Sequence, residues 1–97
     1  MARPGKAARG KRRWVGLRIT PAADSRESCQ EIISDYLSGL NWKMFDCKSD
    51  DLCTLVIIRA HLEDCDETIS RLNESESIQT LTKSGKIRLV RERLGLN

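Results

Sequence analysis

The stretch from Leu52 to Ala60, LCTLVIIRA, constrains the fold more than any other part of the chain. It has almost no polar interruption, is rich in β-branched side chains, and lies between Asp50-Asp51 and Glu63-Asp64. A short apolar run between polar turns is typical of a strand buried on both faces or nearly so. We therefore expect a central strand with other strands beside it and helices covering it.

The composition fits one soluble globular domain. A chain of 97 residues is long enough for one core but too short for two. Of these residues, 39% are hydrophobic and 32% are charged, as in an ordinary globular protein. No apolar stretch approaches the roughly 18 residues of a membrane span, and no apolar segment of a secretory signal follows the basic start. We expect an intracellular protein without a membrane segment, with residues 1–10 as a flexible basic arm and residues 11–97 as a single domain.

Charge is unevenly distributed along the chain. Residues 1–20 contain seven Lys or Arg and no acid, residues 21–82 contain five basic and thirteen acidic residues, and residues 83–97 contain five basic residues and one acid. Clustered positive charge attracts polyanions, whereas scattered charge only increases solubility. Two basic ends around an acidic body therefore indicate nucleic acid as a candidate partner.

The first strand is expected from Lys11 to Thr20, where apolar and polar residues alternate. One of its faces holds Trp14, Gly16 and Arg18. A glycine inside a strand marks either a bulge or the close approach of another segment.

Two helices are expected from capping residues and apolar stripes. Asp24 with Glu27, and Asp64 with Glu67, fit capping boxes. The first helix is expected to end near Gly39 in a left-handed conformation. The stripe of the first helix consists of Cys29, Ile32, Ile33, Tyr36, Leu37 and Leu40, and that of the second of Leu62, Cys65, Ile69 and Leu72.

Two further strands complete the expected fold. Residues 41–47 form a hairpin with the central strand through the polar turn 48–51, and residues 78–82 form the fourth strand. In residues 86–94, Ile87 and Leu89 alternate as in a strand, whereas Ile87, Val90 and Leu94 suit a helix face equally well. We favour a short strand that leads into a frayed or helical end. The order βαββαβ predicts the α+β ferredoxin-like fold, an antiparallel sheet with two helices on one face and a C-terminal extension. The other face is expected to be open.

No catalytic or metal site is predicted. His61 and Cys65 are four residues apart with Cys47 and Cys53 nearby, but the chain has no CxxC pair or zinc knuckle. Free cysteines are usually buried. No third group is placed to orient a Cys–His pair, and no GxGxxG or Walker pattern occurs. We therefore expect no cofactor, no metal ion and no enzymatic nucleophile.

RNA contact through phosphates is the function that these patterns favour. The stretch LCTLVIIRA lacks the aromatic residues on which standard RNA-recognition sheets stack bases. Trp14 and Trp42 are expected in a core or an interface, as large aromatics usually are. Basic side chains would make the contacts; they are Lys11, Arg12, Arg13 and the cluster from Lys83 to Arg93.

Three short motifs follow one another along the chain. They are Lys11-Arg12-Arg13-Trp14-Val15, Ile57-Ile58-Arg59 and Ser84-Gly85-Lys86-Ile87-Arg88. In this order they resemble the K-R-Y-L, I-V-R and S-G-T-I-[KR] motifs of the small protein subunit of archaeal and eukaryotic ribonuclease P.

The resemblance implies a noncatalytic protein that neutralises and positions a catalytic RNA during cleavage of precursor tRNA, beside a larger partner protein. It implies RNA-binding roles for the matched residues Arg12, Arg13, Arg59, Lys86 and Arg88. Lys83 and Arg91 are added to this set on charge alone.

Two other functions stay open. ACT-type regulatory domains share the order βαββαβ, dimerise through sheet edges and bind amino acids. The segment ISRLNESESIQTL is similar to the way such domains end, although the turn Thr20–Asp24 lacks their glycine. The third interpretation is a protein-interaction module that docks a partner or a second copy on the open sheet.

Overall fold

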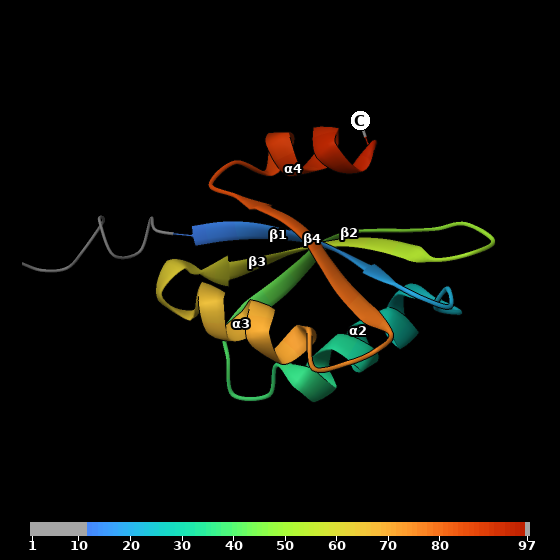
Figure 1. Cartoon of the computed structure of the whole chain (residues 1–97), viewed down its shortest axis with the longest axis horizontal. Coiled ribbons are helices and arrows are strands. Elements are labelled where there is room, and N and C mark those ends of the chain that lie inside the picture. Colours follow the sequence, from blue (N-terminus) through green and yellow to red (C-terminus); the bar gives the residue numbers. More distant parts are fainter. Residues whose placement is uncertain (1–11, 97) are drawn as a thin grey trace, which may run out of the picture.

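The computed structural model describes residues 12–96, which form a four-stranded antiparallel sheet with helices on both faces (Figure 1). In chain order the elements are β1 (Arg12–Ile19), α2 (Arg26–Tyr36), β2 (Trp42–Ser49), β3 (Thr54–His61), the 3₁₀ helix η1 (Leu62–Asp64), α3 (Cys65–Leu72), β4 (Ile78–Ser84) and α4 (Ile87–Leu94). The strand order is β2-β3-β1-β4, so β3 and β1 are the inner strands. The predicted α+β class and antiparallel sheet are confirmed. The predicted arm, residues 1–10, lies outside the described residues, as does Lys11.

β3 is the buried central strand that the sequence predicts. Val56, Ile57 and Ile58 are fully buried. The strand pairs with β1 along one edge and with β2 along the other. Its side chains are covered on both faces, which explains why three consecutive apolar residues occur in it.

The predicted start of this strand at Leu52 is wrong. Pairing begins at Thr54, and Leu52 is 76% exposed in the turn of the β2–β3 hairpin. The carboxylate of Asp50 accepts hydrogen bonds from the backbone N–H groups of Leu52 (2.7 Å) and Cys53 (2.9 Å). An aspartate side chain that accepts hydrogen bonds from the backbone of the next residues stabilises a turn. The strand therefore begins only after this turn.

The main core lies between the sheet and helices α2 and α3, which cover the same face (Figure 1). The predicted alternation of β1 and the apolar stripe of the first helix are confirmed. Gly39 adopts the predicted left-handed conformation (φ +86°), in the turn that follows the helix C-cap Leu37. The buried core residues are Val15, Leu17, Ile19, Cys29, Ile33, Leu37, Met44, Val56, Ile58, Cys65, Leu72 and Ile78.

Neither predicted capping box forms, although Asp64 does occupy the N-cap position of α3. Ser25 is the N-cap of α2 in place of Asp24, because its Oγ accepts a hydrogen bond from the N–H of Ser28 at 3.0 Å. That oxygen satisfies a backbone donor that would otherwise lack a partner. Before α3 the chain makes the η1 turn, in which Asp64 forms no side-chain cap bond and Leu62 is 37% exposed instead of joining the apolar stripe.

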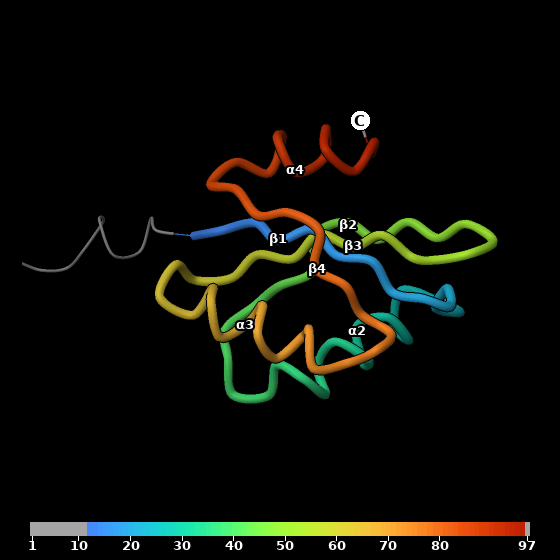
Figure 2. The backbone as a smooth tube through the Cα atoms, viewed as in Figure 1, coloured from blue at the N-terminus to red at the C-terminus, as the bar shows by residue number. Residues whose placement is uncertain are grey.

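The sheet face predicted to be open is partly covered by α4, which lies opposite α2 and α3 (Figure 1, Figure 2). After β4 the chain turns back, and α4 runs over the sheet. Val90 is fully buried. A Cβ built on Gly16 would lie 2.9 Å from a side-chain carbon of Val90 and 2.9 Å from one of Leu94. The helix therefore packs on the space that the missing side chain of Gly16 leaves.

Gly16 fulfils both predicted roles. The close approach is that of α4, and the pairing of β1 with β4 shifts register between Gly16 and Leu17. Residues 87–94 are helical, so the short strand predicted within residues 86–94 does not form. Val90 and Leu94 are spaced to meet the sheet from one helix face. Gly95 ends the helix in the left-handed conformation (φ +74°).

Candidate functional site

The two faces of the sheet differ in their polar side chains. Paired residues of antiparallel strands point to the same face. Gly16 faces α4, so the residues of β1 two positions from it and the residues paired with them on the other strands lie on the same side of the sheet. We call this side the α4 face. Its basic and imidazole side chains on the sheet are Arg12, Arg18, Lys43, Lys48, Arg59 and His61.

The opposite layer is acidic. Residues 20–41 and 62–77, which contain α2, η1, α3 and their flanking turns, hold four and six acidic residues and only one basic residue each. Those basic residues are Arg26 and Arg71, and Arg71 is paired with Glu67 at 2.8 Å. The acidic side chains therefore lie on the side of the sheet opposite the cations of the α4 face (Figure 1). The acids are Asp24, Glu27, Glu31, Asp35, Glu63, Asp64, Asp66, Glu67, Glu74 and Glu76.

An aromatic pair lies on the α4 face. The rings of Trp14 in β1 and Phe45 in β2 meet edge to face, with centroids 4.6 Å apart and planes at 84°. Phe45 is the extra residue of a β-bulge, because Met44 pairs with Ile58 and Asp46 pairs with the neighbouring Ile57. Both rings are half-buried.

Two cations lie against the ring of Phe45. The Nζ of Lys43 is 5.5 Å from the ring centroid, and the guanidinium carbon of Arg59 is 5.2 Å from it. Register explains the assembly, because Arg59 of β3 is paired with Trp14 on one side and with Lys43 on the other. Cation–π contacts of this kind contribute roughly 0.5–1 kcal/mol each at exposed sites. We call Trp14, Lys43, Phe45 and Arg59 the aromatic–basic cluster.

A small pocket adjoins this cluster. Its volume is about 220 Å³, and it is lined by Asn41, Trp42, Lys43, Arg59 and His61. Lys43 and Arg59 belong both to the pocket and to the cluster. With two cations, an imidazole and an amide around it, the pocket suits an anion the size of a phosphate. We call it the basic pocket.

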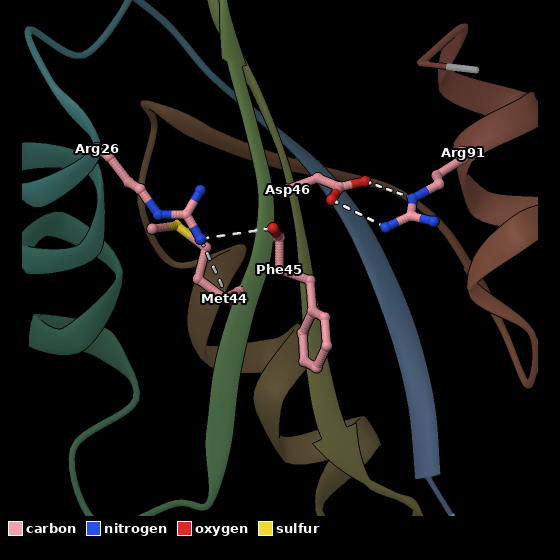
Figure 3. A network of polar contacts seen from close by, with 5 residues as sticks. All are labelled: Arg26, Met44, Phe45, Asp46 and Arg91. Atoms are coloured by element: carbon pink, nitrogen blue, oxygen red, sulfur yellow. Dashed lines mark hydrogen bonds and ion pairs between the residues drawn. The ribbon is translucent and has the colours of Figure 1, made fainter.

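A larger pocket of about 570 Å³ lies along the edge of β2. Figure 3 shows its two arginines. Arg26 of α2 donates to the carbonyl oxygens of Met44 (3.5 Å) and Phe45 (3.4 Å), and Arg91 of α4 binds the carboxylate of Asp46. The hydrogen bond and charge of Asp46 raise the pKa of Arg91. Both guanidinium groups thus form hydrogen bonds within the protein and are less available to a ligand than the ammonium of Lys43 and the guanidinium of Arg59 in the cluster.

The structure divides the predicted RNA-binding residues. Arg12 and Arg59 share the α4 face, where Arg12 is paired with His61 beside the basic pocket. Arg13 is paired with Ala60 and faces the α3 side. Lys83 also faces that side, with its Nζ 3.6 Å from Asp66.

The remaining predicted residues belong to α4 and its start. Lys86 is the N-cap residue of the helix, and Lys86 and Arg88 are exposed. Arg91 is held by Asp46. The eight predicted residues therefore do not form one surface, and Lys11 lies outside the described residues.

Sequence reasoning did not identify Lys43, Phe45 or His61 as site residues. The alternation of the first strand did place Trp14 on the face of Gly16, which was the available signal. The alternation of residues 41–47 likewise places Phe45 on the face of Lys43, where the structure has it, but a local pattern does not give the register that brings β2 and β1 together.

The cysteines behave as core residues. All four thiols are free, and Cys29 and Cys65 are buried, as predicted. Burial raises the pKa of the Cys29 thiol to about 12, with a further contribution from neighbouring Cys47, and burial also raises the pKa of Cys65. A thiol with a raised pKa is a poor nucleophile. In the described part of the chain, no group of three or more His, Cys, Asp or Glu residues is placed to hold a metal ion.

None of the helices between residues 12 and 96 is both long enough and apolar enough to cross a membrane. Comparison with known proteins gave no match: no family model fits the chain, and no curated protein or solved structure is significantly similar to it.

Proposed function

We propose that this chain is a noncatalytic RNA-binding protein that contacts RNA with the α4 face of its sheet. The observation that supports this function best is the aromatic–basic cluster, which adjoins a basic pocket on the face opposite the acidic helices. Lysine and arginine neutralise phosphates and supply most of the affinity of nucleic-acid binding. Arg12, Lys43 and Arg59 are the residues best placed to do so.

The distribution of charge supports an oriented complex. The α2 and α3 layer has an excess of eight negative charges in residues 20–41 and 62–77 together. RNA approaching that side would be repelled, whereas the α4 face attracts it. We therefore expect the acidic layer to set the orientation and the cluster to make the contacts.

We propose the ferredoxin-like arrangement as the architecture. The order βαββαβ through β4, the strand order β2-β3-β1-β4, and the position of α2 and α3 on one face support it. The motifs that resemble the ribonuclease P subunit suggest precursor tRNA or a catalytic RNA as the natural ligand. The protein would then neutralise and position that RNA.

The experiment that tests RNA binding compares two lysines of the sheet. Binding of the full chain to labelled precursor tRNA is measured by fluorescence anisotropy between about 50 and about 200 mM salt. Affinity should fall steeply with salt. Lys43→Ala, which removes a cation of the cluster, should weaken binding and lower the salt slope by about 1.

Lys83→Ala is the matched control. It removes the same charge, but from the side of the sheet that faces Asp66 and α3. Its affinity should stay close to that of the wild type. Equal losses for the two variants would show that the α4 face is not the contact surface, and no binding at low salt would exclude the function.

A second candidate function is a small-ligand regulatory module. It is favoured by a pocket of about 480 Å³ between the turn Thr20–Asp24 and the link that contains Ser75 and Ser77, where an ACT-type interpretation would place a ligand. At one place on each sheet edge, however, a side chain bonds the backbone: Arg26 donates to two carbonyl groups of β2, and Asn73 Oδ1 accepts from the N–H of Thr80 in β4. Edge-to-edge dimers need these groups free.

A thermal-shift screen with the common amino acids separates the two functions. A ligand that binds only the folded state raises the unfolding temperature. A clear shift with one amino acid would favour the regulatory module. No shift, together with salt-dependent RNA binding, would favour the RNA-binding function.

A further inference from the structure

We infer, on the basis of the RNA-binding function proposed above, that the aromatic–basic cluster binds unpaired nucleotides. In this arrangement one base stacks on the aromatic pair, with Trp14 as its main platform, and the adjoining phosphate occupies the basic pocket. The ligand class is therefore single-stranded RNA, or an unpaired loop or end within a folded RNA.

Two aromatic rings lie on the α4 face. Phosphate binding alone needs only cations and gives no reason for two large rings on the α4 face. Trp14 and Phe45 nevertheless meet there, on two strands separated by β3, and both are half-buried instead of fully buried. Nucleobases stack on such platforms with about 1–3 kcal/mol per base, largely independently of sequence.

Trp14 and Phe45 differ in their contacts with cations. Lys43 and Arg59 both lie against Phe45, at 5.5 Å and 5.2 Å from its centroid. No such cation contact involves Trp14 within residues 12–96. The tryptophan is thus the better platform, and Phe45 supports it from the side by the edge-to-face contact.

The basic pocket lies next to the aromatic–basic cluster. Lys43 and Arg59 line the basic pocket as well as the cluster, so the two sites share side chains and adjoin each other. A nucleotide needs this combination, an aromatic surface for the base and cations for the phosphate next to it. Arg12, paired with His61 at the rim of the pocket, can contact the next phosphate.

Single-stranded and duplex RNA offer different groups to such a surface. In a duplex the bases stack on one another and only the backbone and groove edges face a flat protein surface. A purely basic surface would bind both forms. A surface in which Trp14 contributes to binding should prefer the unpaired form.

The experiment measures binding of the full chain to a labelled oligouridine and to a blunt-ended RNA duplex at the same salt concentration. Oligouridine should bind more tightly. Trp14→Leu should weaken its binding about tenfold, which corresponds to about 1.4 kcal/mol, and should leave duplex binding nearly unchanged. Trp14→Phe, which keeps a ring, should recover most of the affinity.

A spectroscopic readout avoids dependence on the leucine variant, which could lose stability. The chain has two tryptophans, and Trp42 packs against the main core through its pairing with Ala60. In the Trp42→Phe variant the remaining fluorescence comes from Trp14. Oligouridine should quench this fluorescence. Because Trp42 also lines the basic pocket, the readout is the quenching of Trp14 and not the affinity of the variant.

The outcomes separate this inference from the proposed function. If oligouridine and duplex bind equally and Trp14 is neither quenched nor needed, the stacking site is excluded, while RNA binding through phosphates stands. If neither RNA binds at low salt, both proposals are overturned. Preferential binding of oligouridine, with loss in Trp14→Leu and quenching in Trp42→Phe, supports the unpaired-nucleotide site.

Discussion

Arg91 of α4 and Asp46 of β2 form a bidentate ion pair across the α4 face, with Nε 2.7 Å from Oδ2 and Nη2 3.1 Å from Oδ1 (Figure 3). The pair joins the last helix to the edge strand β2, and its two residues are 45 positions apart in the sequence. Planar, two-pronged pairs of this kind fix orientation as well as adding attraction. With Val90 on Gly16, the pair gives α4 a second contact with the sheet.

We expect Asp46→Asn to loosen α4 without unfolding the sheet. The amide keeps the shape of the side chain but removes the charge that binds Arg91. Hydrogen exchange should then accelerate at the amides of α4, while those of β1 and β3 stay protected. Arg91→Met should give the same pattern. Uniform acceleration throughout the chain would show that α4 and the sheet unfold as one unit.

Gly16→Ala should destabilise the protein by about 1–3 kcal/mol, the usual cost of overpacking a core. The new Cβ would lie 2.9 Å from carbons of Val90 and Leu94, and 3.2 Å from one of Thr82. Val90 is β-branched and fully buried, so it has little freedom to move. Urea unfolding monitored by circular dichroism measures the loss.

A double mutant tests whether this contact is the cause. Val90→Ala removes one of the two nearest carbons and costs stability by itself. If the clash explains the effect, Gly16→Ala with Val90→Ala should lose less than the sum of the single losses. Strict additivity would mean that the glycine matters for another reason.

Ser25→Ala should cost about 1 kcal/mol, because it removes the cap oxygen from the N–H of Ser28. Asp24→Ala should change stability by less than about 0.5 kcal/mol, as for an exposed residue without such a bond. Both are measured by thermal unfolding at neutral pH. The reverse order of losses would restore Asp24 as the cap.

These caps illustrate what the sequence could and could not predict. The helix around Ile33 follows from apolar periodicity, and the strand around Ile57 follows from a continuous apolar run. Both patterns depend on which side chains are buried and are therefore visible in the sequence. Whether Asp24 or Ser25 caps the helix depends on the turn geometry of a single residue. Either side chain can make the bond, so residue type does not distinguish them.

The C-terminal helix and the candidate site needed tertiary information. Residues 87–94 fit strand and helix periods about equally, and the space over Gly16 decides for the helix. The cluster requires Phe45 to reach Trp14 through a bulge in a strand that is not adjacent to β1. Local sequence patterns do not reveal the register between strands that are distant in the sequence. They do reveal that the helical layer is acidic.

Thr68→Val should stabilise the protein by about 1 kcal/mol. Thr68 of α3 is fully buried, and within residues 12–96 its hydroxyl has no hydrogen-bond partner. Valine has nearly the same shape and similar helix propensity but no polar atom to leave unpaired. A higher urea midpoint with an unchanged slope would agree with this. A lower midpoint would indicate that the hydroxyl is bonded in solution.

The stability of the protein should decrease at alkaline pH because of Cys29. Burial is the main cause that raises the pKa of this thiol from 9.0 to about 12, and Cys47 contributes as well. Between these two pH values the unfolded chain loses the proton while the folded chain keeps it. The stabilisation is therefore fully present below pH 9 and declines as pH rises, by up to about 1.4 kcal/mol per pH unit for one such group.

Replacement of the thiol isolates this effect from the other groups that titrate at high pH. Cys29→Ala is expected to be less stable than the wild type near neutral pH, because it leaves a small cavity. Its stability should nevertheless fall less steeply between about pH 9 and about pH 11. The raised pKa of Cys65 leaves a residual slope in the same direction. Urea unfolding at a series of pH values measures both curves, and parallel curves would mean that Cys29 ionises equally in the folded and unfolded chains.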